Sequence, residues 1–407
     1  MLTRLLAALS AVALIASCAP AANRSESPTP SADTSRSDAV MRIVDDVMKQ
    51  EHLKAVIIRV TENGRELLTR ASGESMTGVP ATPAMHFRNG AVAISYVSTL
   101  LLRLVDQGKV SLDDKLSTWL PDVPHSDQVT LGQLAQMTSG YPDYVIGNTE
   151  FIDASYQDPF RQWEPEQLLG FATSKPLLYE PGTNWNYAHT NYVLLGRALE
   201  KATGEQMPKL LDDEVLEPLG LTNTANSFTP EIPAPVLHAY TSERRETLQI
   251  PSGTPFYEES TFWNPSWTIT DGAIQTTNIY DMEASAAGIG SGKLLSKKSH
   301  ELMVSRDLLG KTHAQPGCAT CGPMTDFYTY GMGIVTSGDW LLQNPLFSGE
   351  AGVMAYLPSK KIAIAIAVTY LPEAFDEQGN YVNAADTLFR RVGAELAPDD
   401  APPTPPR

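Results

Sequence analysis

Two short stretches carry side chains that could take part in chemistry. Tyr187 and His189 stand two positions apart in "NYAHTN", where a phenol and an imidazole can both bind a ligand, and the imidazole titrates near neutral pH. Tyr187 also has a structural interpretation, as a packing residue beside Trp185. Ser95, in "NGAVAISY", is a candidate nucleophile, but a serine hydroxyl is weakly nucleophilic without an activating base.

Other reaction types lack their sequence patterns. There is no Gly-x-Ser-x-Gly elbow and no His-Glu-x-x-His, and "AGIGSGKLL" lacks the first glycine and the final Ser/Thr of a phosphate-binding loop. The adjacent carboxylates Asp113-Asp114 and Asp212-Asp213 would not face one another on a helix. We therefore expect neither a bound metal nor a cofactor.

Composition excludes one class of partner. The 407 residues carry a formal net charge of −17 and no run of Lys or Arg, so the chain lacks the basic surface that nucleic-acid binding requires. The hydrophobic share of 42% and the charged share of 19% are typical of a globular protein with a sizeable core.

The first residues are typical of an export signal. "MLTRLLAALSAVALIASC" has an early arginine, an apolar stretch too short to span a membrane and small residues before Cys18. The quartet "IASC" resembles the bacterial lipobox, which implies cleavage after residue 17 and lipidation of Cys18. We predict a signal peptide over 1–17, a Ser/Pro-rich tether over 18–37, and a protein held by acyl chains on the extracytoplasmic side of a bacterial membrane.

Two further cysteines, Cys318 and Cys321, lie in "PGCATCGP". An even pair in an exported chain favours a disulfide, whereas a zinc site would need two more ligands and only His313 is near. We expect a small disulfide-closed loop here.

The elements around these residues predict one compact unit. A helix is expected from residue 38, a hairpin over 54–73 with its turn at residues 62–64, and strands near the C-terminus in "YTYGMGIVTS", "GVMAYLP" and "KKIAIAIAVTY". These patterns favour an α/β (α+β) fold, in which N- and C-terminal strands form one antiparallel sheet flanked by helices. We place the sheet part at about 38–90 and 325–397, a mostly helical lobe at about 91–324, and a disordered tail at 398–407.

Four stretches resemble one known family, in the same order along the chain. They are "FRNGAVAISYVSTLLLRLVDQGKVSLDDKLSTWLPD", "VTLGQLAQMTSGYPDY", "EPGTNWNYAHTNYVLLGRALEKATG" and "DGAIQTTNIYDMEASAAGIGSGKLLS". They are similar to the serine β-lactamase / penicillin-binding-protein-like superfamily, in its class C and D-Ala-D-Ala carboxypeptidase/esterase branch. The resemblance implies the β-lactamase/transpeptidase fold and a site built from three clusters.

This chain departs from the family at each cluster. The family's Ser-x-x-Lys, which supplies nucleophile and base, falls on Ala91 and Ile94. The Tyr-x-Asn cluster keeps Tyr187 but has His189 at the asparagine position. The edge-strand His-x-Gly falls on Gln343-Asn344-Pro345 or, with a poorer match, on residues 347–349, and neither carries a cationic or imidazole group.

Two functions remain open. The first is a lipoprotein that binds a peptidoglycan-related or other small envelope ligand, or an envelope partner, without hydrolysing it, because nucleophile and base are both missing. The second is a weak esterase or peptidase that uses Ser95, or another displaced hydroxyl, with Tyr187 and His189. An open pocket around Ala91, lined by Tyr187 and His189, would support ligand binding.

Overall fold

The computed structural model describes residues 32–226, 229–269 and 274–405. The expected signal peptide, Cys18 and most of the expected tether lie outside these residues. Within the described ranges, no helix has both the length and the apolar character needed to cross a membrane.

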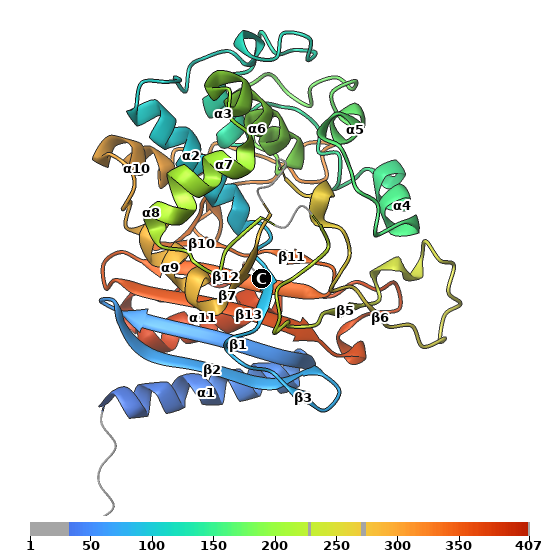
Figure 1. Cartoon of the computed structure of the whole chain (residues 1–407), viewed down its shortest axis with the longest axis vertical. Helices are drawn as coiled ribbons and strands as arrows, with labels where there is room; N and C mark the ends of the chain where they lie inside the picture. Colours follow the sequence, from blue (N-terminus) through green and yellow to red (C-terminus); the bar gives the residue numbers. More distant parts are fainter. Residues whose placement is uncertain (1–31, 227–228, 270–273, 406–407) are drawn as a thin grey trace, which may run out of the picture.

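A nine-stranded antiparallel sheet forms the base of the described molecule, with the order β3-β2-β1-β13-β12-β10-β9-β8 and with β11 paired to β12 (Figure 1). Its strands are β1 (Leu53–Glu62), β2 (Arg65–Met76), β3 (Val79–Pro80), β8 (Thr329–Tyr330), β9 (Val335–Ser337), β10 (Trp340–Gln343), β11 (Leu346–Phe347), β12 (Glu350–Leu357) and β13 (Ile362–Tyr370). Because β1 pairs with β13, the two ends of the chain meet in the centre of the sheet, which confirms the predicted architecture.

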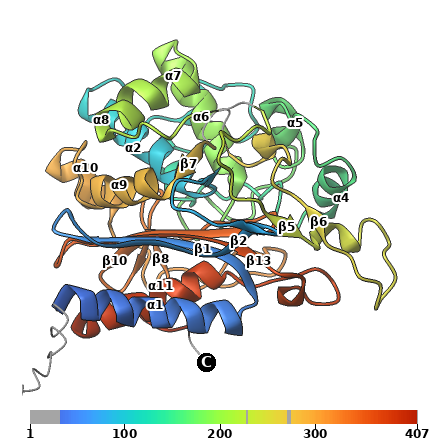
Figure 2. The ribbon, with the colours of Figure 1, turned by 60° about the horizontal axis from the view of Figure 1, so that its bottom comes forward.

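Both faces of the sheet are covered. Every residue of β12 and β13 is buried, as expected for strands that read as near-continuous apolar runs. Helices α1 (Ala32–Gln50) and α11 (Ala384–Leu396) pack on one face, while α9 (Ile279–Gly290) and the lobe cover the other (Figure 2).

The lobe is built mainly from short helices and loops. Its helices are α2 (Val92–Asp106), α3 (Leu131–Ala135), α4 (Thr149–Gln157), α5 (Pro165–Gly170), α6 (His189–Thr203), α7 (Met207–Leu211), α8 (Glu217–Leu219) and α10 (Lys297–Met303). Two small antiparallel pairs join distant segments, β4 (His86–Arg88) with β7 (Thr276–Asn278) and β5 (Tyr240–Thr241) with β6 (Glu258–Glu259). Helix α2 is buried on nearly all sides, which fits its run of apolar residues.

The chain differs from expectation at both ends of the domain. Helix α1 begins at Ala32, so the last part of the predicted tether is helical, and Arg36 donates to Glu62 at 2.7 Å, which ties the start of α1 to the end of β1.

The tail is predicted to be disordered over 398–407, but its described part, 398–405, packs against the domain. Trp340 Nε1 donates to the carbonyl of Asp400 at 2.7 Å, and Arg390 donates to the carbonyl of Pro403 at 2.6 Å. The tail's carbonyls thus satisfy two buried donors that the local sequence pattern does not reveal.

Candidate functional site

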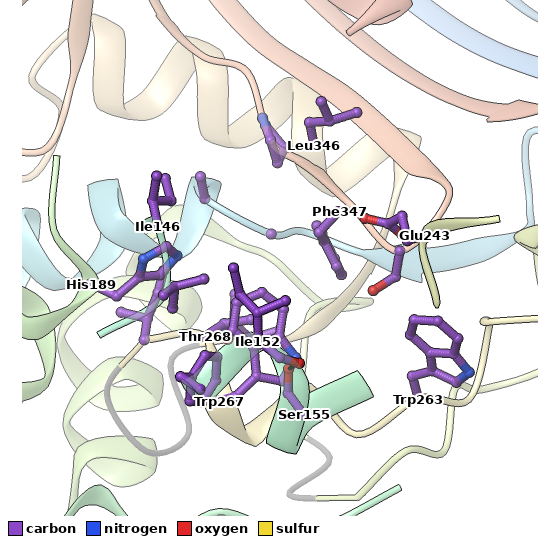
Figure 3. Close-up of a pocket in the computed structure, with 18 of the residues that line it drawn as sticks. Ile146, Ile152, Ser155, His189, Glu243, Trp263, Trp267, Thr268, Leu346 and Phe347 are labelled. Carbon is purple, nitrogen blue, oxygen red and sulfur yellow. Dashed lines mark hydrogen bonds between the residues drawn. The ribbon is translucent and has the colours of Figure 1, made fainter. Parts of the chain in front are cut away.

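A cavity of about 370 Å³ opens over the N-terminal end of α2, between the lobe and the strand segment that follows β10 (Figure 3). Ala91 lies on its floor, and Tyr187 and His189 also line it. Gln343 reaches the same cavity from the end of β10. The structure therefore brings together four residues that the sequence singles out, and they surround open space.

The start of α2 is held in place by its neighbours. Asn89 exchanges side-chain and backbone hydrogen bonds with Gln275, at 2.7 to 3.1 Å. Gly90 has a φ of +52°, and a Cβ built there would lie 2.5 Å from Pro345 and 2.7 Å from Phe347. Glycine is thus required at this turn, which orients the methyl group of Ala91 toward the cavity.

Ile94 and Ser95 do not line this cavity. Ile94 is 1% exposed and belongs to the main hydrophobic core. Ser95 is fully buried, and its hydroxyl donates to the carbonyl of Gly333 at 2.6 Å. The position of the family lysine is therefore part of an apolar core, and the serine beside it is engaged in a structural hydrogen bond.

His189 forms a pair with Asp143, a residue that the sequence analysis did not single out. The Nδ1 atom of His189 lies 3.1 Å from both carboxylate oxygens, and its backbone N–H donates to Asp143 Oδ1 at 2.9 Å at the first residue of α6. This contact favours the tautomer with the proton on Nδ1, which leaves Nε2 as a hydrogen-bond acceptor. Asp143 lies inside "SGYPDY", so its place in a stretch resembling the family was the signal available.

Tyr187 lies beside this pair, with its ring centroid 5.2 Å from that of His189. Burial, with smaller effects from Tyr328 and Asp143, raises the pKa of Tyr187 far above its usual value. The side chain therefore stays a neutral phenol at physiological pH. It can donate a hydrogen bond to a ligand, but it does not supply a phenolate base.

Gln343 occupies the edge position where the family has a donor or cationic group. Its Nε2 atom donates to the carbonyl of Gly333 at 2.8 Å, the same oxygen that accepts from Ser95. The amide nitrogen is thus already used by the protein, and the position holds a neutral group.

Six aromatic side chains form much of the rest of the lining, and we call them the aromatic wall: Phe151, Tyr156, Trp163, Trp263, Trp267 and Phe347. Glu243 lies near Trp263, across the cavity from His189 (Figure 3). Its carboxylate accepts from the hydroxyls of Thr241 at 2.8 Å and Tyr156 at 3.4 Å, and burial raises its pKa to about 7. A single acid in a loop has no sequence pattern, so nothing in the chain pointed to Glu243.

Cys318 and Cys321 are joined by a disulfide. Its loop borders the site, since Thr320 Oγ1 donates to the carbonyl of Tyr187 at 2.9 Å and Cys321 forms a bridge with Asn186. The same loop also packs close to Gly147, the residue after Ile146, because a Cβ on Gly147 would lie 3.2 Å from the Cβ of Ala319. Among the described residues, no group of three or more His, Cys, Asp or Glu side chains is arranged to hold a metal ion.

Comparisons with known proteins agree on the family. The Beta-lactamase family model matches residues 40–389. The chain is 28% identical over 198 residues to the Esterase EstB of Burkholderia gladioli, which covers 46% of this chain and 50% of that protein. It is 30% identical over 184 residues to Penicillin-binding protein 4 of Amycolatopsis lactamdurans, which covers 44% of this chain and 46% of that protein.

Among solved structures, a D-amino acid amidase from Ochrobactrum anthropi, complexed with L-phenylalanine amide, superposes with a TM-score of 0.73 at 22% identity. The match covers 90% of this chain and 99% of that one, and at this identity it shows the fold. The chain spans about half the length of the curated relatives that it matches.

Proposed function

Because the chain belongs to the Beta-lactamase family, within the serine β-lactamase and penicillin-binding-protein-like superfamily, we propose that it is a member that binds a small ligand of the cell envelope without hydrolysing it. The observation that carries this proposal is the open cavity over α2, whose floor at the family's nucleophile position is the methyl group of Ala91. The space for a ligand is kept, while the group that would attack it is replaced.

The chemistry of the lining supports binding over turnover. Acyl transfer in this family needs a serine activated by a neighbouring base. Ile94 offers no base, and Tyr187 remains a neutral phenol. His189 can accept a hydrogen bond at Nε2, but no serine hydroxyl is paired with it among the described contacts. The lining provides groups that orient a ligand and none arranged as an activated nucleophile.

The alternative of a weak serine hydrolase needs Ser95 or another displaced hydroxyl as the nucleophile. Among the hydroxyls that line the cavity, that of Ser155 donates to the carbonyl of Ile152 at 2.9 Å and that of Thr268 to the carbonyl of Pro265 at 2.7 Å. The other candidate is Ser95. Its hydroxyl is buried, donates to the carbonyl of Gly333 and is absent from the cavity lining. A substrate in the cavity would not reach it without rearrangement of α2. The geometry therefore favours the non-hydrolytic proposal.

We further propose that the protein is held at the outer side of a bacterial membrane through acylated Cys18, on the evidence of the lipobox-like quartet. A disulfide between Cys318 and Cys321 fits an oxidising, extracytoplasmic compartment. Fractionation of cells that express the full chain tests the anchor. Cys18→Ser should move the protein from the membrane to the soluble fraction, and retention in the membrane would overturn this part of the proposal.

The absence of hydrolysis is tested with a fluorescent penicillin. The protein should show no covalent band on a denaturing gel, next to an active penicillin-binding protein as control. Turnover of a p-nitrophenyl ester should be the same for the wild type and for Ser95→Ala. A covalent band, or turnover that Ser95→Ala abolishes, would overturn the proposal.

Ligand binding is tested separately with soluble muropeptides from a peptidoglycan digest. We expect them to raise the unfolding temperature of the wild type, since a ligand that binds the folded state stabilises it. Ala91→Phe should remove this shift by filling the cavity floor while leaving the outer surface intact. An unfolding temperature that muropeptides leave unchanged would overturn the peptidoglycan assignment.

A further inference from the structure

We infer that the cavity over α2 selects an aromatic ligand that carries an ammonium group and rejects one of the same shape that carries a carboxylate, with Glu243 as the contact for the ammonium group. This inference rests on the proposed function, because it assumes that the cavity holds a ligand, and among peptidoglycan fragments it favours those that carry a free ammonium group over those that carry only carboxylates.

The aromatic wall favours a ligand whose apolar part is an aromatic ring. Its six rings offer broad flat surfaces, and a cavity of about 370 Å³ is large enough for a single-ring ligand with a short chain. Aromatic pairs gain stabilisation beyond burial alone when rings pack edge to face or offset. Ring faces also attract cations, which adds to the preference for an ammonium group near Trp263 and Tyr156.

The charge of the residues that line the cavity determines which charged group of a ligand is favoured. Asp158 and Glu243 line the cavity, and none of the described lining residues is Lys or Arg. His189 already has a carboxylate partner in Asp143. A ligand carboxylate would therefore enter a cavity with two acids and no free cation, at a cost that grows as water is excluded.

Two arginines lie just behind the lining and do not change this balance. Arg244 is paired with Glu258 at 3.0 Å, and its guanidinium lies 5.7 Å from the ring centre of Trp263. Arg161 stacks on the ring of Trp163 at 3.9 Å and is exposed to solvent, so its charge is screened. Neither arginine lines the cavity.

Glu243 is the acid best placed to bind an ammonium group. It forms no ion pair with a described Lys or Arg. Its hydrogen-bond donors are neutral: the hydroxyls of Thr241 and Tyr156 and the backbone N–H groups of Ser348 and Gly349. Burial raises its pKa to about 7, which is typical of a carboxyl group that lacks a compensating positive charge. A ligand ammonium would supply that charge and hold the carboxyl group in its ionised form.

The tyrosines around Glu243 do not change charge in the pH range in which Glu243 ionises, so they do not mask its effect on ligand affinity. Tyr156, Tyr370 and Tyr381 interact with it, and burial raises the pKa of each well above the usual tyrosine value. All three remain neutral between pH 6 and 8. Affinity for an ammonium ligand should therefore rise across this range as Glu243 loses its proton.

Calorimetry with three ligands of one shape tests the inference: 3-phenylpropylammonium, 3-phenylpropanamide and 3-phenylpropanoate. At pH 8 we expect the ammonium compound to bind the wild type about tenfold or more tightly than the carboxylate, with the amide between them. Ala91→Phe should abolish binding of all three.

Variants assign the preference to Glu243. Glu243→Gln should reduce the ammonium-to-carboxylate ratio to within about threefold and leave affinity for the amide nearly unchanged. Glu259→Gln is the matched control, because this acid pairs with His238 and does not line the cavity. If Glu243→Gln fails to fold, the ranking of the three ligands on the wild type and the smaller effect expected of Asp158→Asn still decide the question.

The outcomes separate the inference from the proposed function. If the carboxylate binds as tightly as the ammonium compound, the inference is overturned while the binding function stands. If none of the three binds but muropeptides still shift the unfolding temperature, the ligand class is wrong and the proposed function survives. A full ammonium preference in Glu243→Gln would overturn the role of that residue.

Discussion

At the scale of single residues, the two positions where the family has its nucleophile and its base are not equivalent. Ala91 faces the cavity, where a small polar group would meet solvent or ligand. Ile94 is 1% exposed and packs in the core. A hydroxyl could return at position 91 at little cost, whereas an ammonium group at position 94 would have to be buried.

The first prediction concerns this burial. Ile94→Lys should lower the free energy of unfolding by about 3 kcal/mol or more, because an unpaired ammonium group would enter an apolar core. Ile94→Leu is the control and should cost less than about 1.5 kcal/mol. Urea unfolding followed by tryptophan fluorescence measures both, and equal stability of the two variants would contradict the buried position.

A second prediction concerns Glu350, which is buried beside Arg88. Burial raises the pKa of Glu350 to about 7 against the opposing effect of Arg88, so the folded state holds this proton more tightly than the unfolded chain. The stabilisation is complete below the unfolded value of 4.5 and is lost as pH rises to about 7. The free energy of unfolding should therefore fall between pH 5 and pH 8.

Glu350→Gln should flatten this pH dependence, even if it lowers stability overall by removing the carboxylate charge that lies near Arg88. The change across the window is on the order of 3 kcal/mol for a shift of this size. Urea unfolding at several pH values gives the slope for both proteins. Identical slopes would show that Glu350 does not hold its proton as described.

The sequence singled out four of the residues that line the cavity. Ala91, Tyr187, His189 and Gln343 are found together because aligned family motifs carry them to one place. Asp143 was not singled out although it lies in the family-like stretch "SGYPDY", and Glu243 was missed because an isolated acid in a loop has no periodicity or spacing to mark it. Ser95 follows the nucleophile position by four residues, and the rotation of the helix directs it to Gly333.

At the scale of elements, the disulfide loop supports the segment of the cavity lining that carries Tyr187 and His189. Asn184 and His313 exchange hydrogen bonds at 3.1 Å, and Thr320 holds the carbonyl of Tyr187. The disulfide between Cys318 and Cys321 closes this loop next to the segment that carries Tyr187 and His189. The loop is thus placed to hold the two cavity-lining side chains in position.

A third prediction follows for this loop. Replacing both Cys318 and Cys321 with serine should weaken binding of 3-phenylpropylammonium by about three- to tenfold, because the segment under Tyr187 loses its support. Global stability should fall by only about 2 kcal/mol, since the closed loop is very short. Calorimetry and thermal unfolding measure the two effects.

Thr320→Val is the matched comparison, because it removes only the hydrogen bond to Tyr187 and keeps the disulfide. It should reproduce part of the loss in affinity without the loss in stability. Unchanged affinity in both variants would mean that the loop does not position the cavity wall.

The elements themselves were largely predictable. The hairpin of β1 and β2 follows from two β-rich runs joined at Asn63-Gly64, and β13 follows from its alternation of Ile and Ala. The start of α1 and the ordering of the tail were not, because Arg36 and Trp340 are held by partners far away in the sequence. Such tertiary contacts leave no local pattern.

At the scale of the whole molecule, the sheet separates two surfaces. The cavity lies on the side of the lobe. Helices α1 and α11 and the described part of the C-terminal tail lie on the other side (Figure 2). The tail contacts buried groups of that second side, Trp340 and Arg390 among them. Stability and binding should therefore respond separately to changes on the two faces.

The fourth prediction uses this separation. Truncation after Ala397 should lower the free energy of unfolding by about 1–3 kcal/mol, because it leaves the indole N–H of Trp340 and one Arg390 donor without their acceptors. Truncation after Pro403 keeps both contacts and should have little effect. Affinity for 3-phenylpropylammonium should be unchanged in both, and a loss of affinity in the longer deletion would show that the two faces are coupled.

The methyl group at position 91 also bears on how long a ligand would stay bound. An enzyme of this fold empties its site by converting what it holds, so its occupancy depends on a chemical rate. A site with no nucleophile can only let its occupant leave, and its lifetime is the reciprocal of a dissociation rate. At equilibrium the fraction of occupied molecules of the proposed binding protein would then follow the free concentration of its ligand, and the ligand would be released unaltered.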